Sequence, residues 1–265
     1  LDQRFDLQAT IVPDSAEKSI SKAVFYMDGQ EIKLPVALKT CATGCQPKLT
    51  KNSTIVTLRA ISNAKPGLHQ FQVEATQSDG QLIKASGNFE IVPWQVGGQK
   101  IKNIIIMLGD GMGAAQRTAA RIVANGYAQG KAKSALAMDT FPVSGQIKTA
   151  SLNSLVTDSA PGMSAYVLGN KNNNNEEGVF PDDTLDPFDN PRIEYLSEYL
   201  HRKQNKALGI VTTADVFDST PAGNAVHTSS RSAGTGIVDQ FLDDRSLTGL
   251  TVLMGGGRKW FLTAE

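Results

Sequence analysis

The pattern of apolar and polar positions changes character near residue 95. Before that point the apolar residues form short segments, several of them alternating with polar positions, at residues 7–12, 22–27, 53–59, 69–75 and 82–92. Asp-Gly pairs at 28–29 and 79–80 are typical of the tight turns of β-hairpins. Regular short strands without a helical period predict an all-β sandwich over residues 1–95.

Part of this region carries a structural resemblance. Pro66-Gly-Leu-His-Gln-Phe-Gln-Val-Glu-Ala75, followed by Ser78-Asp-Gly80, resembles the later strands of bacterial immunoglobulin-like domains. We therefore expect residues 1–95 to form an immunoglobulin-like β-sandwich that serves as a spacer or a stabilising module.

After a linker-like stretch at residues 92–100 the pattern becomes mixed. Continuous apolar runs of strand length occur at residues 103–108, 207–213 and 250–254. Helical periods with start and stop signals occur at residues 114–124, 160–168, 193–202 and 236–242. Strands that are apolar on both faces and alternate with helices predict a three-layer α/β/α fold with a mostly parallel sheet over residues 96–265.

A polar insertion at residues 170–190 interrupts this alternation. It holds an asparagine run at 172–175 and six carboxylates, namely Glu176, Glu177, Asp182, Asp183, Asp186 and Asp189. Carboxylates are calcium ligands, but their spacing here lacks the regular EF-hand pattern. We expect a solvated, mobile loop that borders the same cleft as Ser159.

Composition narrows the class of protein. The 265 residues include 26 basic and 26 acidic ones, so there is no charge excess that would suggest a nucleic-acid partner. No apolar run approaches the ~18 residues of a membrane span. Cys41 and Cys45 are too few for a zinc site and favour a small disulfide loop over two free thiols. We therefore expect a periplasmic or extracellular protein.

Candidate chemistry begins where an apolar run gives way to the helix predicted at residues 160–168. Thr157, Asp158 and Ser159 stand at that junction. A hydroxyl there lies beside free backbone N–H groups at the positive end of a helix dipole, which is a natural seat for an anion. The alternative is that Asp158 or Ser159 only caps the helix.

Polar residues also follow two predicted strands, at the sheet edge where ligands of α/β folds gather. Asp110 lies among glycines, which suits a cation rather than a dinucleotide, although an ordinary turn aspartate is the alternative. Asp218 and Thr220 follow the second strand, and Arg231 comes thirteen residues after Asp218. Arginine clamps oxyanions through two parallel hydrogen bonds.

Four stretches, in this order, resemble the alkaline phosphatase family: Lys102-Asn-Ile-Ile-Ile-Met-Leu-Gly-Asp-Gly-Met-Gly113, Val156-Thr-Asp-Ser-Ala160, Asp218-Ser-Thr-Pro-Ala222 with Arg231, and Val252-Leu-Met-Gly-Gly-Gly-Arg-Lys259. The resemblance covers roughly residues 100–265, the N-terminal part of such a catalytic domain. It implies an alkaline-phosphatase-like fold and the hydrolysis of phosphate monoesters through a phosphoserine.

The family's roles carry over residue by residue. Ser159 matches the nucleophile, Arg231 the phosphate clamp, and Asp158 the acid that orients the clamp. The family uses two Zn²⁺ and one Mg²⁺, and its metal ligands are matched here by Asp110, Ser159, Asp218 and Thr220. Asp110 matches a carboxylate shared between one zinc and the magnesium, and Asp218 and Thr220 match magnesium ligands.

The remaining zinc ligands of the family are not matched. His69, His201 and His227 have no ligand role in the resemblance, so we expect them to be structural or at the surface. Because the chain stops at Glu265 just after a strand and a glycine turn, we expect the missing ligands to come from a C-terminal remainder, in the same or a separate chain. The resemblance also implies a homodimer.

Two other hypotheses stay open at this point: a phosphodiesterase or sulfatase of the same superfamily, and a binding module. A phosphodiesterase of the same superfamily commonly has Thr at the position of Ser159, and a sulfatase needs a modified Cys or Ser in a motif that is not visible here. An adhesion or binding module, led by the β domain and carrying an incomplete catalytic part, is compatible with the chain's end at Glu265.

Overall fold

The computed structural model describes residues 2–42, 44–93 and 101–262, so most of the linker predicted at residues 92–100 lies outside the described residues. Two compact units are present. One comprises Leu1–Val96 with Ala150–Glu265, and the other comprises Gly97–Thr149. Among the described residues, no helix is both long and apolar enough to cross a membrane.

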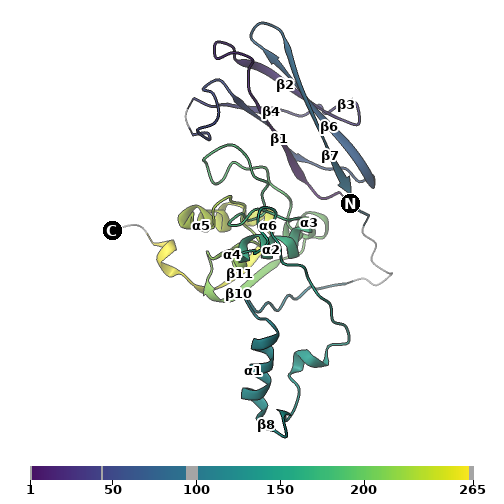
Figure 1. Cartoon of the computed structure of the whole chain (residues 1–265), viewed down its shortest axis with the longest axis vertical. Coiled ribbons are helices and arrows are strands. Elements are labelled where there is room, and N and C mark those ends of the chain that lie inside the picture. Colours follow the sequence, from purple (N-terminus) through teal and green to yellow (C-terminus); the bar gives the residue numbers. More distant parts are fainter. Residues whose placement is uncertain (1, 43, 94–100, 263–265) are drawn as a thin grey trace. The chain divides into compact units, whose positions relative to one another are not determined.

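The N-terminal strands form two antiparallel sheets (Figure 1). The first has the order β1 (Phe5–Ile11), β5 (Thr54–Ile61) and β4 (Val36–Thr40). The second has the order β3 (Gln30–Glu31), β2 (Ile20–Met27), β6 (Gly67–Gln77) and β7 (Leu82–Ile91). Both sheets contribute to one buried core, with Leu7, Val56 and Leu58 from the first and Phe25 and Val73 from the second.

The five predicted strands of this region and both Asp-Gly turns are confirmed. Asp28 and Gly29 have φ of 50° and 79°, the left-handed pair that a tight hairpin turn requires, and Met27 pairs with Gln30 across it. The sequence did not predict β3, which has two residues, or β4, whose residues are mostly exposed and lack an apolar alternation.

Residues 150–262 form the second part of the same unit (Figure 1). Strands β10 (Leu208–Asp215) and β11 (Leu250–Gly256) pair in parallel, with Ile210 opposite Leu253. The helices are α2 (Ser159–Leu168), α3 (Leu196–Gln204), α4 (Ser219–Ala222), α5 (Gly234–Asp243) and α6 (Arg245–Thr248), and the 3₁₀ turn η2 (Arg258–Phe261) follows β11. Ile210 packs with Ile237 and Phe241 of α5 in a second buried core. The predicted helices and strands of this part are confirmed to within a few residues.

The other unit is small. It contains α1 (Ala114–Asn125), β8 (Tyr127–Ala128), β9 (Lys131–Ala132) and the 3₁₀ turn η1 (Ala137–Thr140). The predicted helix is confirmed, and Arg121 pairs with Asp139 through two 2.6 Å hydrogen bonds. The strand predicted at residues 103–108 is wrong for this structure: the segment has no strand assignment, and Ile105 and Met107 are 82% and 88% exposed. A parallel strand needs neighbouring strands and covering helices, and the described residues of this unit form only the short β8–β9 pair.

The insertion at residues 170–190 is not the solvated loop that its composition predicts. Residues 172–177, which we call the asparagine segment, include Asn172 and Glu177, whose exposed fraction is 0%. Glu177 pairs with Thr228 through backbone hydrogen bonds of 2.8 and 3.0 Å. Backbone pairing with Thr228 and the bond from the Asn172 side chain to Val179 O hold these residues in the interior.

The far end of the insertion is attached to the β sheets. The buried carboxylate of Asp6 accepts hydrogen bonds from Arg59 Nη1 at 2.6 Å, Ala60 N at 2.7 Å and Arg192 N at 2.9 Å. The expected disulfide between Cys41 and Cys45 is present, and Cys45 forms an isolated antiparallel bridge with Thr184. Strands β1 and β5 and the disulfide loop therefore hold the insertion in place.

Candidate functional site

Three residues predicted for the site form one ionic cluster. Arg231 Nη1 donates to Asp158 Oδ2 and Arg231 Nη2 donates to Asp218 Oδ1, both at 2.6 Å. Asp158 precedes α2, and Asp218 follows β10, so residues 73 and 13 positions away from Arg231 meet at one guanidinium. The side chains of Asp158 and Arg231 are 25% and 26% exposed, so the cluster is half-buried and partly open to solvent.

The electrostatics of the cluster keep Arg231 charged. Burial lowers the pKa of the Arg231 guanidinium, but its hydrogen bonds to Asp158 and Asp218 and the charges of both carboxylates raise that pKa by more. Charge-assisted hydrogen bonds of this length are the strong kind. Arg231 is therefore positively charged, and Asp158 and Asp218 hold the plane of its guanidinium in place.

Asp158 occupies the N-cap position of α2 but its side chain does not cap the helix. Its two carboxylate oxygens instead accept hydrogen bonds from Asn175 N at 3.0 Å and from Arg231. Ser159, the first residue of α2, is half-buried. The predicted C-terminal stop is confirmed, since Gly169 is left-handed with φ 78°.

Asp218 and Thr220 lie at the start of α4, directly after β10. Asp218 Oδ1 also accepts a hydrogen bond from Ser219 N at 2.8 Å, so this carboxylate caps a helix and holds Arg231 at once. Ser219 is fully buried, and its hydroxyl has no hydrogen-bond partner within residues 2–42, 44–93 and 101–262.

Glu177 is the residue of this region that the sequence reasoning missed. Its side chain is fully buried, and neither carboxylate oxygen has a hydrogen-bond partner among the residues that the structure describes. Burial raises the pKa of Glu177 to about 8, a rise that the nearby Ser219 and the charge of Arg231 partly offset. Its position in a run of asparagines and acids is typical of an exposed loop, so the sequence gives no signal of its burial.

The donors around Asp218 suit Mg²⁺ better than Zn²⁺. Carboxylates and hydroxyls are hard oxygen ligands, whereas zinc sites mostly use His or Cys. The unpartnered buried oxygens of Glu177 and Ser219 are further oxygen donors beside this cluster. Among the described residues, no group of three His, Cys, Asp or Glu lies close enough to hold a metal. These residues therefore fit part of a magnesium site and do not supply a zinc site.

Asp110 belongs to the other unit. It lies in a turn in which Met112 N donates to Gly109 O at 3.1 Å and Gly111 has φ 65°, a backbone conformation that favours glycine. The structure thus brings Asp158, Asp218 and Arg231 together, with Ser159 and Thr220 adjoining them in sequence, and describes Asp110 separately.

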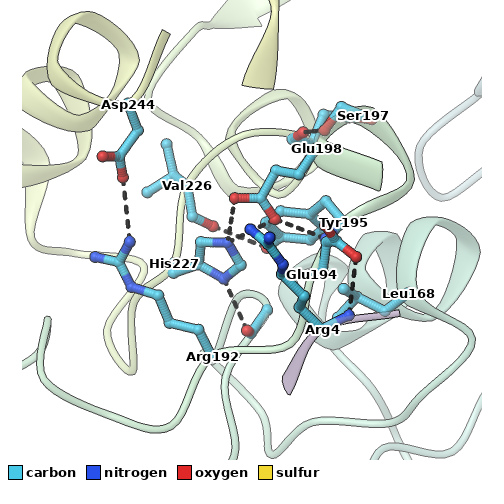
Figure 2. A network of polar contacts seen from close by, with 12 residues as sticks. Arg4, Leu168, Arg192, Glu194, Tyr195, Ser197, Glu198, Val226, His227 and Asp244 are labelled. Carbon is cyan, nitrogen blue, oxygen red and sulfur yellow. Dashed lines mark hydrogen bonds and ion pairs between the residues drawn. The ribbon is translucent and has the colours of Figure 1, made fainter. Parts of the chain in front are cut away.

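The three histidines bond to protein groups. His69 Nδ1 lies 2.7 Å from Asp28 Oδ2, and His201 Nδ1 donates to Lys206 O at 2.8 Å. Figure 2 shows His227 in a buried polar network, where it is stacked on Tyr195 and its Nε2 lies 3.2 Å from Glu198 Oε2. His227 Nδ1 also donates to Gly178 O at 2.8 Å.

Comparison with known proteins gives a consistent result. The alkaline phosphatase family model matches residues 101–265. The chain is 35% identical over 176 residues to the tissue-nonspecific alkaline phosphatase isozyme of Gallus gallus, covering 60% of this chain and 34% of that protein. It is 29% identical over 239 residues to an alkaline phosphatase of Escherichia fergusonii, covering 79% of this chain and 47% of that protein.

A solved structure, a cold-active alkaline phosphatase from Shewanella sp., is 27% identical, with a TM-score of 0.47 over 58% of this chain and 36% of that one. The chain spans between 34% and 47% of the length of the two curated relatives named above. Because the family match extends over more than half of its residues, this chain belongs to the alkaline phosphatase family.

Proposed function

We propose that the chain carries the phosphate-binding part of an enzyme that hydrolyses phosphate monoesters through a phosphoserine. The observation that supports this most directly is the cluster in which Asp158 and Asp218 each lie 2.6 Å from the Arg231 guanidinium, next to the start of α2. The relatives reported above are alkaline phosphatases, which favours monoesters over the diesters and sulfate esters that the sequence left open.

Ser159 is the proposed nucleophile. As the first residue of α2, it lies at the positive end of the helix dipole, where a phosphate dianion is stabilised. Attack of its hydroxyl oxygen on phosphorus forms the phosphoserine bond and releases the substrate's alcohol. Water then breaks that bond and releases inorganic phosphate.

Arg231 is the proposed clamp for the transferring phosphoryl group. Asp158 and Asp218 fix the orientation of its guanidinium, so little reorganisation is needed when negative charge develops on the phosphoryl oxygens. Partial burial strengthens this attraction relative to water. Asp158 acts through Arg231 and orients it.

The proposed metal complement is one Mg²⁺ and two Zn²⁺. Asp218, Thr220 and Asp110 would hold the magnesium, and Asp110 and Ser159 would contribute to the zinc sites. When bound, such metals lower the pKa of a hydroxyl nucleophile and neutralise phosphate charge. The zinc pair rests on the resemblance alone, since the described residues lack its nitrogen ligands, and we derive no step through it.

The same proposal extends to organisation and location. We take residues 1–95 as an immunoglobulin-like β-sandwich and residues 96–265 as the N-terminal part of a three-layer α/β/α catalytic domain. A C-terminal remainder in the same or a separate chain would complete the site, within a homodimer. The Cys41–Cys45 disulfide supports a periplasmic or extracellular location.

The test is hydrolysis of an aryl phosphate by the full-length protein, with and without a chelator. Ser159→Ala should lower kcat by at least about 10³-fold, because the nucleophile is lost. Ser21→Ala, at an exposed position of β2, is the matched control. Full turnover in Ser159→Ala would reject the mechanism, and faster hydrolysis of an aryl diester than of the monoester would reject the substrate class.

A further inference from the structure

The backbone of Asn175 closes a ring of hydrogen bonds with the two residues that form the proposed phosphate clamp. Asn175 N donates to Asp158 Oδ1 at 3.0 Å, and Asn175 O accepts from Arg231 N at 3.0 Å. The side chains of Arg231 and Asp158 complete the ring at 2.6 Å. One exposed residue of the asparagine segment thus holds both ends of the ion pair.

This geometry depends on an uncommon backbone conformation. Asn175 has φ 70°, in the left-handed region that asparagine and glycine adopt readily and β-branched residues avoid. In this conformation its N–H and C=O reach Asp158 and Arg231. The side chain of Asn175 is exposed, so its size has little influence on packing.

The asparagine segment is fixed on both sides of Asn175. Asn174 donates from its backbone to Asn153 Oδ1 at 3.0 Å and from its side chain to Val156 O at 3.1 Å. Glu177 pairs with Thr228 through two backbone hydrogen bonds. The segment therefore joins the loop before Ser159 to the loop before Arg231.

Buried groups behind the segment make this connection rigid. Gly178, with φ 63°, lies against Tyr195 and His227, since a Cβ at this position would come within 2.3 Å of the Tyr195 hydroxyl oxygen. Tyr195 and His227 belong to the polar network of Figure 2, where the Tyr195 hydroxyl donates to Val226 O at 2.8 Å. The network fixes residue 178 and the strand-like pairing next to it.

We propose that Asn175 is a positioning residue of the phosphate site, which sets the orientation of Asp158 and Arg231 through its left-handed backbone. This inference rests on the proposed function in one respect only, namely that Arg231 binds the phosphoryl group. The asparagine segment is then a specific part of the site rather than a solvated insertion.

The test compares two substitutions at the same exposed position. Asn175→Val strains the left-handed backbone and should weaken competitive inhibition by inorganic phosphate about tenfold in the full-length protein, with a similar rise in KM and a smaller change in kcat. Asn175→Gly retains the conformation and should rescue both constants to within about twofold. In an Arg231→Ala background, Asn175→Val should have no further effect on phosphate inhibition.

A matched control separates positioning from general strain. Asn205 ends α3 with a left-handed φ of 53° and is also exposed. Asn205→Val should lower thermal stability to a similar extent as Asn175→Val while leaving phosphate inhibition unchanged. Equal weakening of phosphate inhibition by Asn205→Val, or by Asn175→Gly, would overturn the proposal.

Hydrogen exchange on this chain gives a second readout that does not depend on catalysis. The amides of Asn175 and Arg231 donate in the ring, so both should lose protection in Asn175→Val and keep it in Asn175→Gly. Unchanged protection in Asn175→Val would overturn the positioning role. If the wild-type full-length protein does not hydrolyse the aryl phosphate, the proposed function fails while the exchange result still decides the role of Asn175.

Discussion

Two short segments of this chain, residues 104–108 and residues 172–177, have opposite chemistry and opposite burial. The first is entirely apolar, and its Ile105 and Met107 are 82% and 88% exposed. The second is asparagine and glutamate throughout, and its Asn172 and Glu177 are 0% exposed. The difference shows that the hydrophobicity of a segment does not by itself decide whether it is buried. The polar segment is hydrogen-bonded to backbone and side-chain groups of three loops, whereas no described residue forms a strand beside the apolar one.

The largest expected effect concerns the burial of Glu177. Burial raises its pKa from an ordinary 4.5 to about 8, so between these values the folded chain holds a proton that the unfolded chain releases. Stability contributed by this proton is complete below pH 4.5 and is lost as pH rises through about 8. We expect a loss of up to roughly 4–5 kcal/mol in unfolding free energy across this window.

Urea unfolding of the chain at pH 5 and pH 9, in the presence of a chelator, measures this loss. Glu177→Gln keeps the shape of the side chain without its titration and should make the pH dependence clearly shallower. A Glu177→Gln variant with the same pH dependence as the wild type would show that the carboxylate is ionised, and therefore better solvated than its burial suggests.

The next effect concerns the attachment of the insertion to the β sheets. Asp6→Ala removes three hydrogen bonds to a buried carboxylate and leaves Arg59 with backbone carbonyls alone as its partners. We expect a loss of about 3 kcal/mol, measured by urea unfolding at pH 7. Asp14→Ala, which removes an exposed ion pair with Lys18, is the matched control and should cost much less. Equal losses would mean that the insertion is held by other contacts.

The smallest expected change in stability concerns the apolar segment at residues 104–108. Ile105→Ala should change the stability of this chain by less than about 0.5 kcal/mol, because the side chain is already 82% exposed. Ile55→Ala, at a position that is 2% exposed in β5, should cost about 2–4 kcal/mol. Thermal and urea unfolding of both variants measure the two losses in unfolding free energy, which can then be compared.

The same pair of variants sharpens the proposal of a C-terminal remainder. If that remainder adds strands beside residues 103–108, Ile105→Ala should cost about as much as Ile55→Ala in the full-length protein. A small cost in both contexts would contradict the parallel strand that the sequence predicts there.

Local signals predicted most of the secondary structure. Alternation and Asp-Gly turns located five strands, and a glycine placed the end of α2. Residue types and positions singled out Asp158, Asp218 and Arg231, and the family resemblance gave Asp158 the role of orienting Arg231. The contact between Asp218 and Arg231 was not predicted. The sequence could not predict the exposure of residues 103–108 or the burial of Glu177. Both are set by residues distant in sequence, which neither periodicity nor composition encodes.

The start of α2 lacks a side-chain cap. Asp158 has the residue type and the position of a helix cap, yet its carboxylate is directed to Asn175 and Arg231. A side-chain cap contributes about 1 kcal/mol to a helix, which α2 forgoes. Its first turn therefore lacks the stabilisation that a side-chain cap would add. Under the proposed function, an engineered variant that capped α2 through residue 158 should gain thermal tolerance and lose affinity for phosphate, so stabilisation and activity would oppose each other at this helix start.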